Sequence, residues 1–260
     1  MPASGIIDNV PLWLLCLLTA GLVLLAVEVG WRMGNRARQR TTVDKDAPIG
    51  AAVGATLGLL AFLLAFTFGM AASRFDTRKQ MVLQEANAIG TTYLRADFLP
   101  EPQRSDVRNV LRAYAILHSR GVSEMVTPEN MAQSAKLQDQ LWADTAAVVA
   151  QDDSIKVALF VESLNELIDM DSTRVTAGRN HIPGSIWFAL YVVTVLAMVA
   201  MGYQFGLNGQ RNWAVTLLLT MVFTAVIIII ADLDRPQGGT LRVSQQAILD
   251  VIDRIGAPAP

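Results

Sequence analysis

The feature that most constrains this chain is a set of four long stretches that contain no Asp, Glu, Lys or Arg. These stretches cover residues 9–27, 47–73, 180–210 and 212–231. A helix rises about 1.5 Å per residue, so each stretch is long enough to cross a hydrocarbon core of about 30 Å. A helix that is apolar on every side has no stable place at the surface of a water-soluble protein. The sequence therefore predicts an integral membrane protein.

The pattern predicts an all-α fold: a polytopic membrane protein with four transmembrane helices and a helical extramembrane insertion between helices 2 and 3. The insertion is expected to be helical because apolar residues recur at helical spacing, as in Val107, Leu111 and Tyr114. The expected domains are helices 1 and 2 in 1–72, the insertion in 73–182, helices 3 and 4 in 183–233, and a polar tail with a short amphipathic helix in 234–260.

Two local signals mark helix ends inside the insertion. Gly121 follows an apolar stripe and is typical of the position just past a helix end. Thr127, Pro128 and Glu129 form a start signal. A hydroxyl can cap the new helix, proline fits its first turn, and an acid suits its positive end.

Composition and motifs argue against several functional classes. The net charge of −2 gives no reason to expect a nucleic-acid partner. The two histidines, His118 and His181, belong to no His-Glu-x-x-His pair, and the sequence has no phosphate-binding glycine loop and no Gly-x-Ser-x-Gly elbow. We therefore expect that the chain is not an enzyme and that it holds no metal and no cofactor.

The membrane orientation is predicted from the basic residues. Residues 32–49, which link the first two membrane helices, hold the densest basic cluster: Arg32, Arg36, Arg38, Arg40 and Lys45. The positive-inside tendency places this link in the cytoplasm. Four crossings then put the insertion on the outer side of a bacterial cytoplasmic (inner) membrane. The insertion also has basic residues near its membrane ends, but long insertions have little influence in this tendency.

The second membrane helix carries the pattern most informative about function. Gly50, Gly54 and Gly58 recur every four residues, and small residues at this spacing let helix backbones approach closely. Phe62 and Phe66 follow, one turn apart. Two interpretations stay open. These residues pack helices within one subunit, or they line a pore at the axis of an oligomer, where the phenylalanines would exclude water.

Acidic residues of the insertion also allow two interpretations. Glu162, Glu166 and Asp169 share one face of a predicted helix, opposite its apolar stripe. Such a face is ordinarily solvated. Repeated by symmetry, it would instead form a vestibule that concentrates cations.

Acids near the membrane helices are expected to have simple roles. Glu28 lies one turn from Arg32, so an ion pair within the helix is expected. Asp232 and Asp234 end the last membrane helix, where they could attract cations at a mouth, although solvated interfacial acids are the simpler expectation.

A run of residues beyond helix 2 resembles a known family. Residues 71–76 read Ala-Ala-Ser-Arg-Phe-Asp, and residues 85–95 read Glu-Ala-Asn-Ala-Ile-Gly-Thr-Thr-Tyr-Leu-Arg. This pattern is similar to that of the bestrophin-like family of bacterial membrane proteins. The residues that carry the family motif are Arg74, Glu85, Asn87 and Tyr93.

The family label refers to bestrophins, which are pentameric ion channels with pore-lining aromatic residues on the second membrane helix. The resemblance implies that Phe62 and Phe66 lie in a pore neck. It also implies a cytoplasmic insertion, whereas the basic link indicates the opposite side. The acidic calcium-binding cluster that follows the last membrane helix of bestrophins is missing from this sequence.

The leading hypothesis is a homo-oligomeric ion channel in the lipid bilayer, with helix 2 around the axis and the insertion forming a vestibule. Inorganic ions would pass through it. The acids favour cations, whereas the resemblance implies anions. The alternative hypothesis is a non-conducting membrane scaffold or sensor whose insertion binds a partner protein.

Overall fold

The structure of the chain is a computed structural model that describes residues 10–40, 48–125, 127–209, 211–235 and 239–256, so Lys45 of the basic link lies outside the described residues. Within these ranges every regular element is helical, which confirms the predicted all-α fold class. The chain divides into two compact units. We call residues 1–73 with 181–241 the membrane unit, and residues 74–180 with 242–260 the polar unit.

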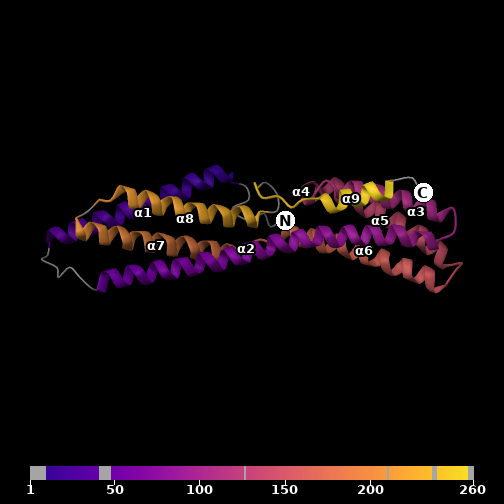
Figure 1. Cartoon of the computed structure of the whole chain (residues 1–260), viewed down its shortest axis with the longest axis horizontal. Helices are drawn as coiled ribbons and strands as arrows, with labels where there is room; N and C mark the ends of the chain where they lie inside the picture. Colours follow the sequence, from indigo (N-terminus) through magenta and orange to yellow (C-terminus); the bar gives the residue numbers. More distant parts are fainter. Residues whose placement is uncertain (1–9, 41–47, 126, 210, 236–238, 257–260) are drawn as a thin grey trace. The chain divides into compact units, whose positions relative to one another are not determined.

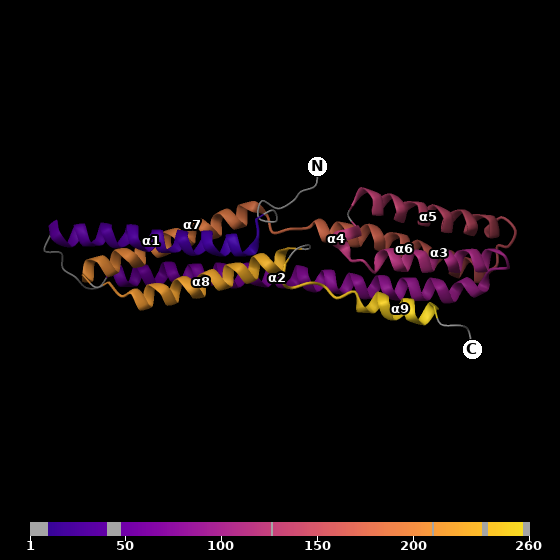
Figure 2. The same cartoon turned by 90° about the horizontal axis from the view of Figure 1, so that it is seen from above.

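The membrane unit contains α1 (Leu12–Arg40), the first part of α2 (Pro48–Arg95), α7 (Gly184–Asn208) and α8 (Trp213–Asp234). Among the residues that the structure describes, four helices are long and apolar enough to cross a membrane, as predicted. α1 packs along α7 and also contacts α8, and Figures 1 and 2 show these three helices side by side.

α1 and α7 meet through glycines that the sequence analysis did not single out. A Cβ atom on Gly30 or Gly34 of α1 would collide with the backbone of α7. The relation is reciprocal, because a Cβ atom on Gly202 or Gly206 of α7 would collide with the backbone of α1. Each helix therefore contributes one Gly-x-x-x-Gly pair, and the pairs let the two backbones touch.

The acids at the end of α8 are buried, so the expectation of solvated side chains was wrong. Asp234 is 6% exposed, and its two carboxylate oxygens accept from the backbone N–H of Ile182 at 2.9 and 3.2 Å. Asp232 is 5% exposed and accepts from the backbone N–H of Thr240 at 2.7 Å and from its hydroxyl. The backbone N–H groups of Ile182, before α7, and of Thr240, beyond α8, thus replace water as hydrogen-bond donors to these carboxylates.

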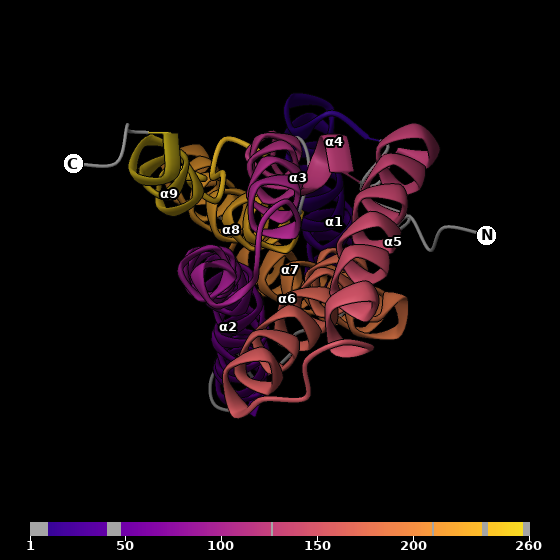
Figure 3. The same cartoon turned by 90° about the vertical axis from the view of Figure 1, so that its right-hand side faces the viewer.

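The polar unit combines the second part of α2 with η1 (Ala96–Phe98), α3 (Gln103–His118), α4 (Val122–Met125), α5 (Pro128–Val149), α6 (Ile155–Arg179) and α9 (Gln246–Gly256). α3 packs against both α5 and α9, and Figure 3 shows it between them. The core includes the fully buried side chains of Leu111, Tyr114 and Phe160. Burying one such side chain stabilises the fold by about 1.5–3 kcal/mol.

Both predicted helix-end signals in the polar unit are confirmed. Gly121 follows α3 with φ of +86°, a left-handed conformation that glycine adopts without steric cost. The hydroxyl of Thr127 accepts from the backbone N–H of Asn130 at 3.3 Å, and Pro128 is the first residue of α5. The sequence therefore sets these helix ends locally.

Candidate functional site

The membrane part of α2 has one buried face and one exposed face. Leu60, Leu64 and Ala71 are buried and lie along one side of the helix. Phe62 and Phe66 are 66% and 58% exposed, although both are large apolar side chains. A membrane unit that leaves two phenylalanines open in this way presents them to lipid or to another subunit.

Of the three glycines predicted to matter on α2, one faces α7 and two lie on the exposed side of the helix. A Cβ atom on Gly54 or Gly58 would meet no atom within 4 Å in the described part of the chain. A Cβ atom on Gly50 would lie 3.2 Å from Nε2 of Gln204, which belongs to α7. Gly50 therefore faces α7, whereas Gly54 and Gly58 lie on the open side.

The acids expected in a vestibule lie together on α6. Glu162, Glu166 and Asp169 are all exposed, as their spacing predicts. Glu162 forms an ion pair with Arg95 at 3.7 Å, but its side chain is 72% exposed. Exposed pairs of this kind contribute only about 0–1 kcal/mol, so these acids are available to ions in the surrounding water.

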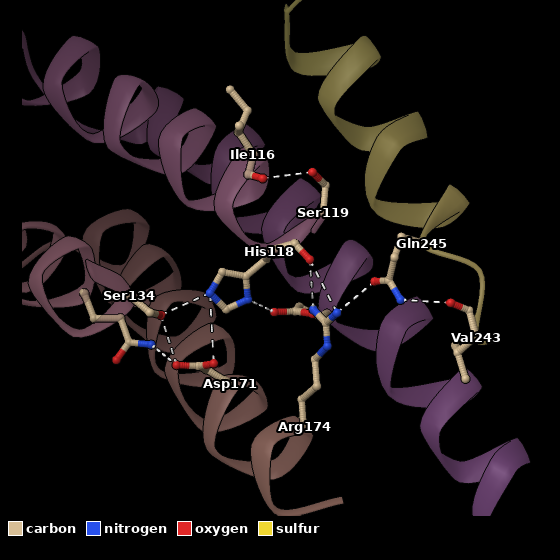
Figure 4. A network of polar contacts seen from close by, with 10 residues as sticks. Ile116, His118, Ser119, Ser134, Asp171, Arg174, Val243 and Gln245 are labelled. Atoms are coloured by element: carbon tan, nitrogen blue, oxygen red, sulfur yellow. Dashed lines mark hydrogen bonds and ion pairs between the residues drawn. The ribbon is translucent and has the colours of Figure 1, made fainter. Parts of the chain in front are cut away.

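A buried polar cluster lies in the interior of the polar unit (Figure 4). One carboxylate oxygen of Glu85, on α2, pairs with Nδ1 of His118 on α3. The other oxygen pairs with Nη1 of Arg174 on α6. Glu85 and His118 are fully buried, and Arg174 is 4% exposed. Three helices are thus joined by ionised or polar groups that have no access to water.

The cluster extends from His118 and Arg174 to further elements. Nε2 of His118 lies 3.0 Å from the hydroxyl of Ser134, which in turn donates to Asp171 at 3.2 Å. Arg174 donates from Nη2 to Oε1 of Gln245 at 2.8 Å, which ties α6 to the residue before α9. Nδ1 of His118 faces Glu85 and Nε2 faces Ser134, so both imidazole nitrogens have a hydrogen-bond partner within the cluster.

Tyr114 closes one side of this cluster. Its ring stacks on the imidazole of His118 with the ring centroids 3.9 Å apart. Burial raises the pKa of Tyr114 well above its ordinary value, and the negative charges of Glu85 and Asp171 raise it further. The phenol therefore stays protonated at any physiological pH.

The residues of the family motif have different positions. Tyr93 is buried, accepts from Nη2 of Arg112 at 2.6 Å and donates to the carbonyl oxygen of Ile255 at 3.2 Å, which anchors α9. Glu85 is the centre of the polar cluster. Asn87 is exposed and Arg74 is half-buried on α2. The motif thus contributes two anchors of the polar unit, at Glu85 and Tyr93.

Sequence reasoning missed His118 and Arg174 as partners of Glu85. No local pattern pairs them, because they lie 33 and 89 residues from Glu85 along the chain. The sequence did contain one signal for this pairing. An acid, a histidine and an arginine fall on the apolar faces of three predicted helices, where they would need one another as partners. Among the described residues, no group of three or more His, Cys, Asp or Glu side chains is placed to hold a metal ion.

Comparisons with known proteins agree with this architecture. A family profile described as "Bestrophin-like domain" matches residues 15–248. No curated protein sequence matches the chain. A crystal structure of a bacterial bestrophin homologue from Klebsiella pneumoniae, in a mutant form, superposes with a TM-score of 0.66 at 14% identity, covering 92% of this chain and 96% of that chain. Another structure of a bacterial bestrophin homologue from that organism superposes with a TM-score of 0.65 at 14% identity. It covers 93% of this chain and 95% of that chain.

Proposed function

This chain belongs to the bestrophin-like family, and on that premise we propose that it is a homo-oligomeric ion channel of the cytoplasmic membrane with α2 lining the pore. The match to the family profile over residues 15–248 confirms the resemblance predicted from the sequence. The observation that carries the proposal is the open face of α2, with Gly58, Phe62 and Phe66 exposed on a membrane-spanning helix.

The proposal needs several copies of the chain, because one α2 helix cannot enclose a pore. Gly54 and Gly58 would let neighbouring α2 helices approach the axis closely, since neither is used for close packing within the described part of the subunit. Phe62 and Phe66 of each copy would then form two apolar rings. Such rings close a pore by excluding water when they are narrow.

The exposed acids of α6 would stand in a vestibule of the same oligomer. Glu162, Glu166 and Asp169 would raise the local concentration of cations, because like charges that line a water-filled space add their potentials. Rings of acids are typical of cation channels. Family membership favours anions, as the resemblance implies. Replacing the three acids together with glutamines and measuring reversal potentials distinguishes the two selectivities.

We propose that the polar unit faces the outer side of the membrane. Arg211 pairs with Glu28, so the basic end of α1 and the link between α7 and α8 lie at the same end of the membrane unit. Arg36, Arg38 and Arg40 are exposed at this end. The density of exposed basic charge at this end of the membrane unit favours a cytoplasmic position for the link.

Pore lining by α2 is tested with cysteine variants in a Cys16→Ser background. Phe62→Cys should make the current sensitive to a water-soluble thiol reagent. Leu17→Cys is the matched control, because Leu17 is 62% exposed on α1 and would face lipid. Equal block of both variants, or no block of either one, would contradict a pore along α2. Native mass spectrometry in mild detergent gives the number of copies, and a monomer would also contradict the proposal.

A second candidate function, a non-conducting scaffold, is favoured by one surface of the polar unit. An apolar cavity of about 570 Å³ lies between α5 and α6 and is lined by Trp142, Val149 and Val157. Trp142 and Val149 are 46% and 44% exposed, which is typical of a protein contact. Replacing Trp142 with serine would weaken partner binding in a scaffold and would leave the current of a channel intact.

A further inference from the structure

The membrane unit has a groove between α1 and α8 that takes no part in the proposed pore. Its volume is about 420 Å³, which is within the range of about 300–1,000 Å³ for small-molecule sites. Its wall is largely apolar and includes Gly21, Leu24, Leu25, Phe205 and Thr216. Because α1 and α8 are long and apolar enough to cross a membrane, the groove between them opens toward lipid.

One end of the groove is charged. Glu28 accepts from Nε of Arg32 at 2.9 Å and from Nη2 of Arg211. The guanidinium of Arg211 also lies over the rings of Trp31 and Trp213, 4.5 and 4.7 Å from their centroids. Two guanidinium groups thus share one carboxylate. The side chains of Arg32 and Arg211 are 63% and 44% exposed, so N–H groups that Glu28 does not use can bind an anion.

The length of the groove matches one leaflet of a bilayer. Gly21 and Arg32 both lie on α1, and at about 1.5 Å per residue they are about 16 Å apart along the helix axis. This is about half of a hydrocarbon core of about 30 Å. Arginine and tryptophan are typical of the interface, which places the charged end at the level of the headgroups.

The deep end of the groove is open. A Cβ atom on Gly21 would meet no atom within 4 Å among the described residues. The next turns of the wall are formed by Leu24 and Leu25, and Leu25 is 63% exposed. An apolar chain can therefore lie along α1 without displacing any side chain of the protein.

We propose that this groove binds one anionic phospholipid, with its phosphate held by Arg32 and Arg211 and one acyl chain lying along Gly21, Leu24 and Leu25. The excess positive charge selects an anionic headgroup over a zwitterionic one, whose own cation would approach the arginines. The apolar wall selects a lipid over free phosphate. This inference goes beyond ion conduction and does not depend on it, so either proposal can fail alone.

The test is a titration of the purified full-length protein, followed by native mass spectrometry, with phosphatidylglycerol, phosphatidylcholine or inorganic phosphate. Wild type should bind phosphatidylglycerol more tightly than phosphatidylcholine. Arg211→Gln should weaken phosphatidylglycerol binding about fivefold, the effect of roughly one basic residue near an anionic lipid surface. Gly21→Leu should weaken it about tenfold, because the new side chain displaces about two methylenes of the acyl chain.

Two variants serve as matched controls. Arg36→Gln removes an exposed arginine that does not line the groove, and Leu18→Phe enlarges an exposed residue of α1 outside it. Both should bind phosphatidylglycerol like wild type. If Arg211→Gln lowers the melting temperature, Arg32→Gln replaces it, because Arg32 is the more exposed of the pair.

Three results would overturn the proposal. Equal binding of the two lipids would show that the arginines do not select the headgroup. Full competition by inorganic phosphate, with no effect of Gly21→Leu, would show a headgroup site without a bound chain. Loss of oligomers in Arg211→Gln at unchanged lipid binding would show that the groove is a contact between copies of the chain.

Discussion

The guanidinium of Arg174 is paired with the carboxylate of Glu85 in the interior of the polar unit, where neither side chain has more than 4% exposure. This contact joins α6 to α2, and the other carboxylate oxygen of Glu85 joins α2 to α3 through His118. Removing one member of a buried ion pair is far more costly than removing both, because an uncompensated charge stays behind. The cluster therefore fixes how the helices of the polar unit pack.

Glu85→Gln should destabilise the polar unit by about 3–5 kcal/mol, because Arg174 and His118 lose their shared anionic partner. The double variant Glu85→Gln/Arg174→Met should be less destabilised than the sum of the single variants. Hydrogen exchange of peptides from α3 and α6 measures both effects. Glu162→Gln is the control, since Glu162 is exposed. A Glu85→Gln protein with the exchange rates of wild type would show that the pair has no structural role.

Gly202→Ala should destabilise the membrane unit by about 1–3 kcal/mol or more, because the added methyl group would collide with the backbone of α1. Gly69→Ala is its matched control, since a Cβ atom on Gly69 would meet no atom within 4 Å among the described residues. Size-exclusion chromatography after heating in detergent compares the two. Equal melting of both variants would contradict the close contact between α1 and α7.

Asp144 should make the polar unit less stable at neutral pH than in weak acid. Burial raises the pKa of Asp144, and the nearby charge of Asp106 raises it further. Its contribution to stability is therefore complete below the unfolded pKa of about 3.9 and is lost as pH rises through the folded pKa. Asp144→Asn should stabilise the polar unit at pH 7 by roughly 0.5 kcal/mol, a small value because Asp144 is partly solvated.

Denaturant unfolding followed by hydrogen exchange, at neutral pH and near the unfolded pKa, measures this difference. Asp139→Asn, on the exposed face of the same helix α5, is the control and should change stability at neither pH. A stabilisation by Asp144→Asn that grows in acid would have the wrong sign and would refute the assigned cause.

The outer position of the polar unit predicts which engineered cysteines are accessible. In a Cys16→Ser background, Glu124→Cys on spheroplasts should react with an impermeant maleimide, and Arg38→Cys should react only after lysis. Both positions are exposed in the described structure. Labelling of position 38 but not position 124 on spheroplasts would reverse the orientation.

The sequence predicted what depends on local pattern or composition. Apolar length predicted four spans, and Thr127 and Gly121 predicted helix ends, because these features act within a few residues. It did not predict which helices pair. The pattern at Gly202 and Gly206 was present, but nothing local shows that its partner is α1 rather than α2. The burial of Asp232 was also missed, because its donors belong to residues 240 and 241, which fold back from beyond the helix.

The most direct test of the channel account is the current carried by purified wild-type protein in planar bilayers, compared with that of Phe66→Ala. Removing one of the two rings of phenylalanines should widen the narrowest, driest part of the pore. The account predicts discrete currents for wild type and a larger or more frequent conductance for Phe66→Ala. Absence of any current from correctly assembled protein, together with an unchanged leak in Phe66→Ala, would contradict it.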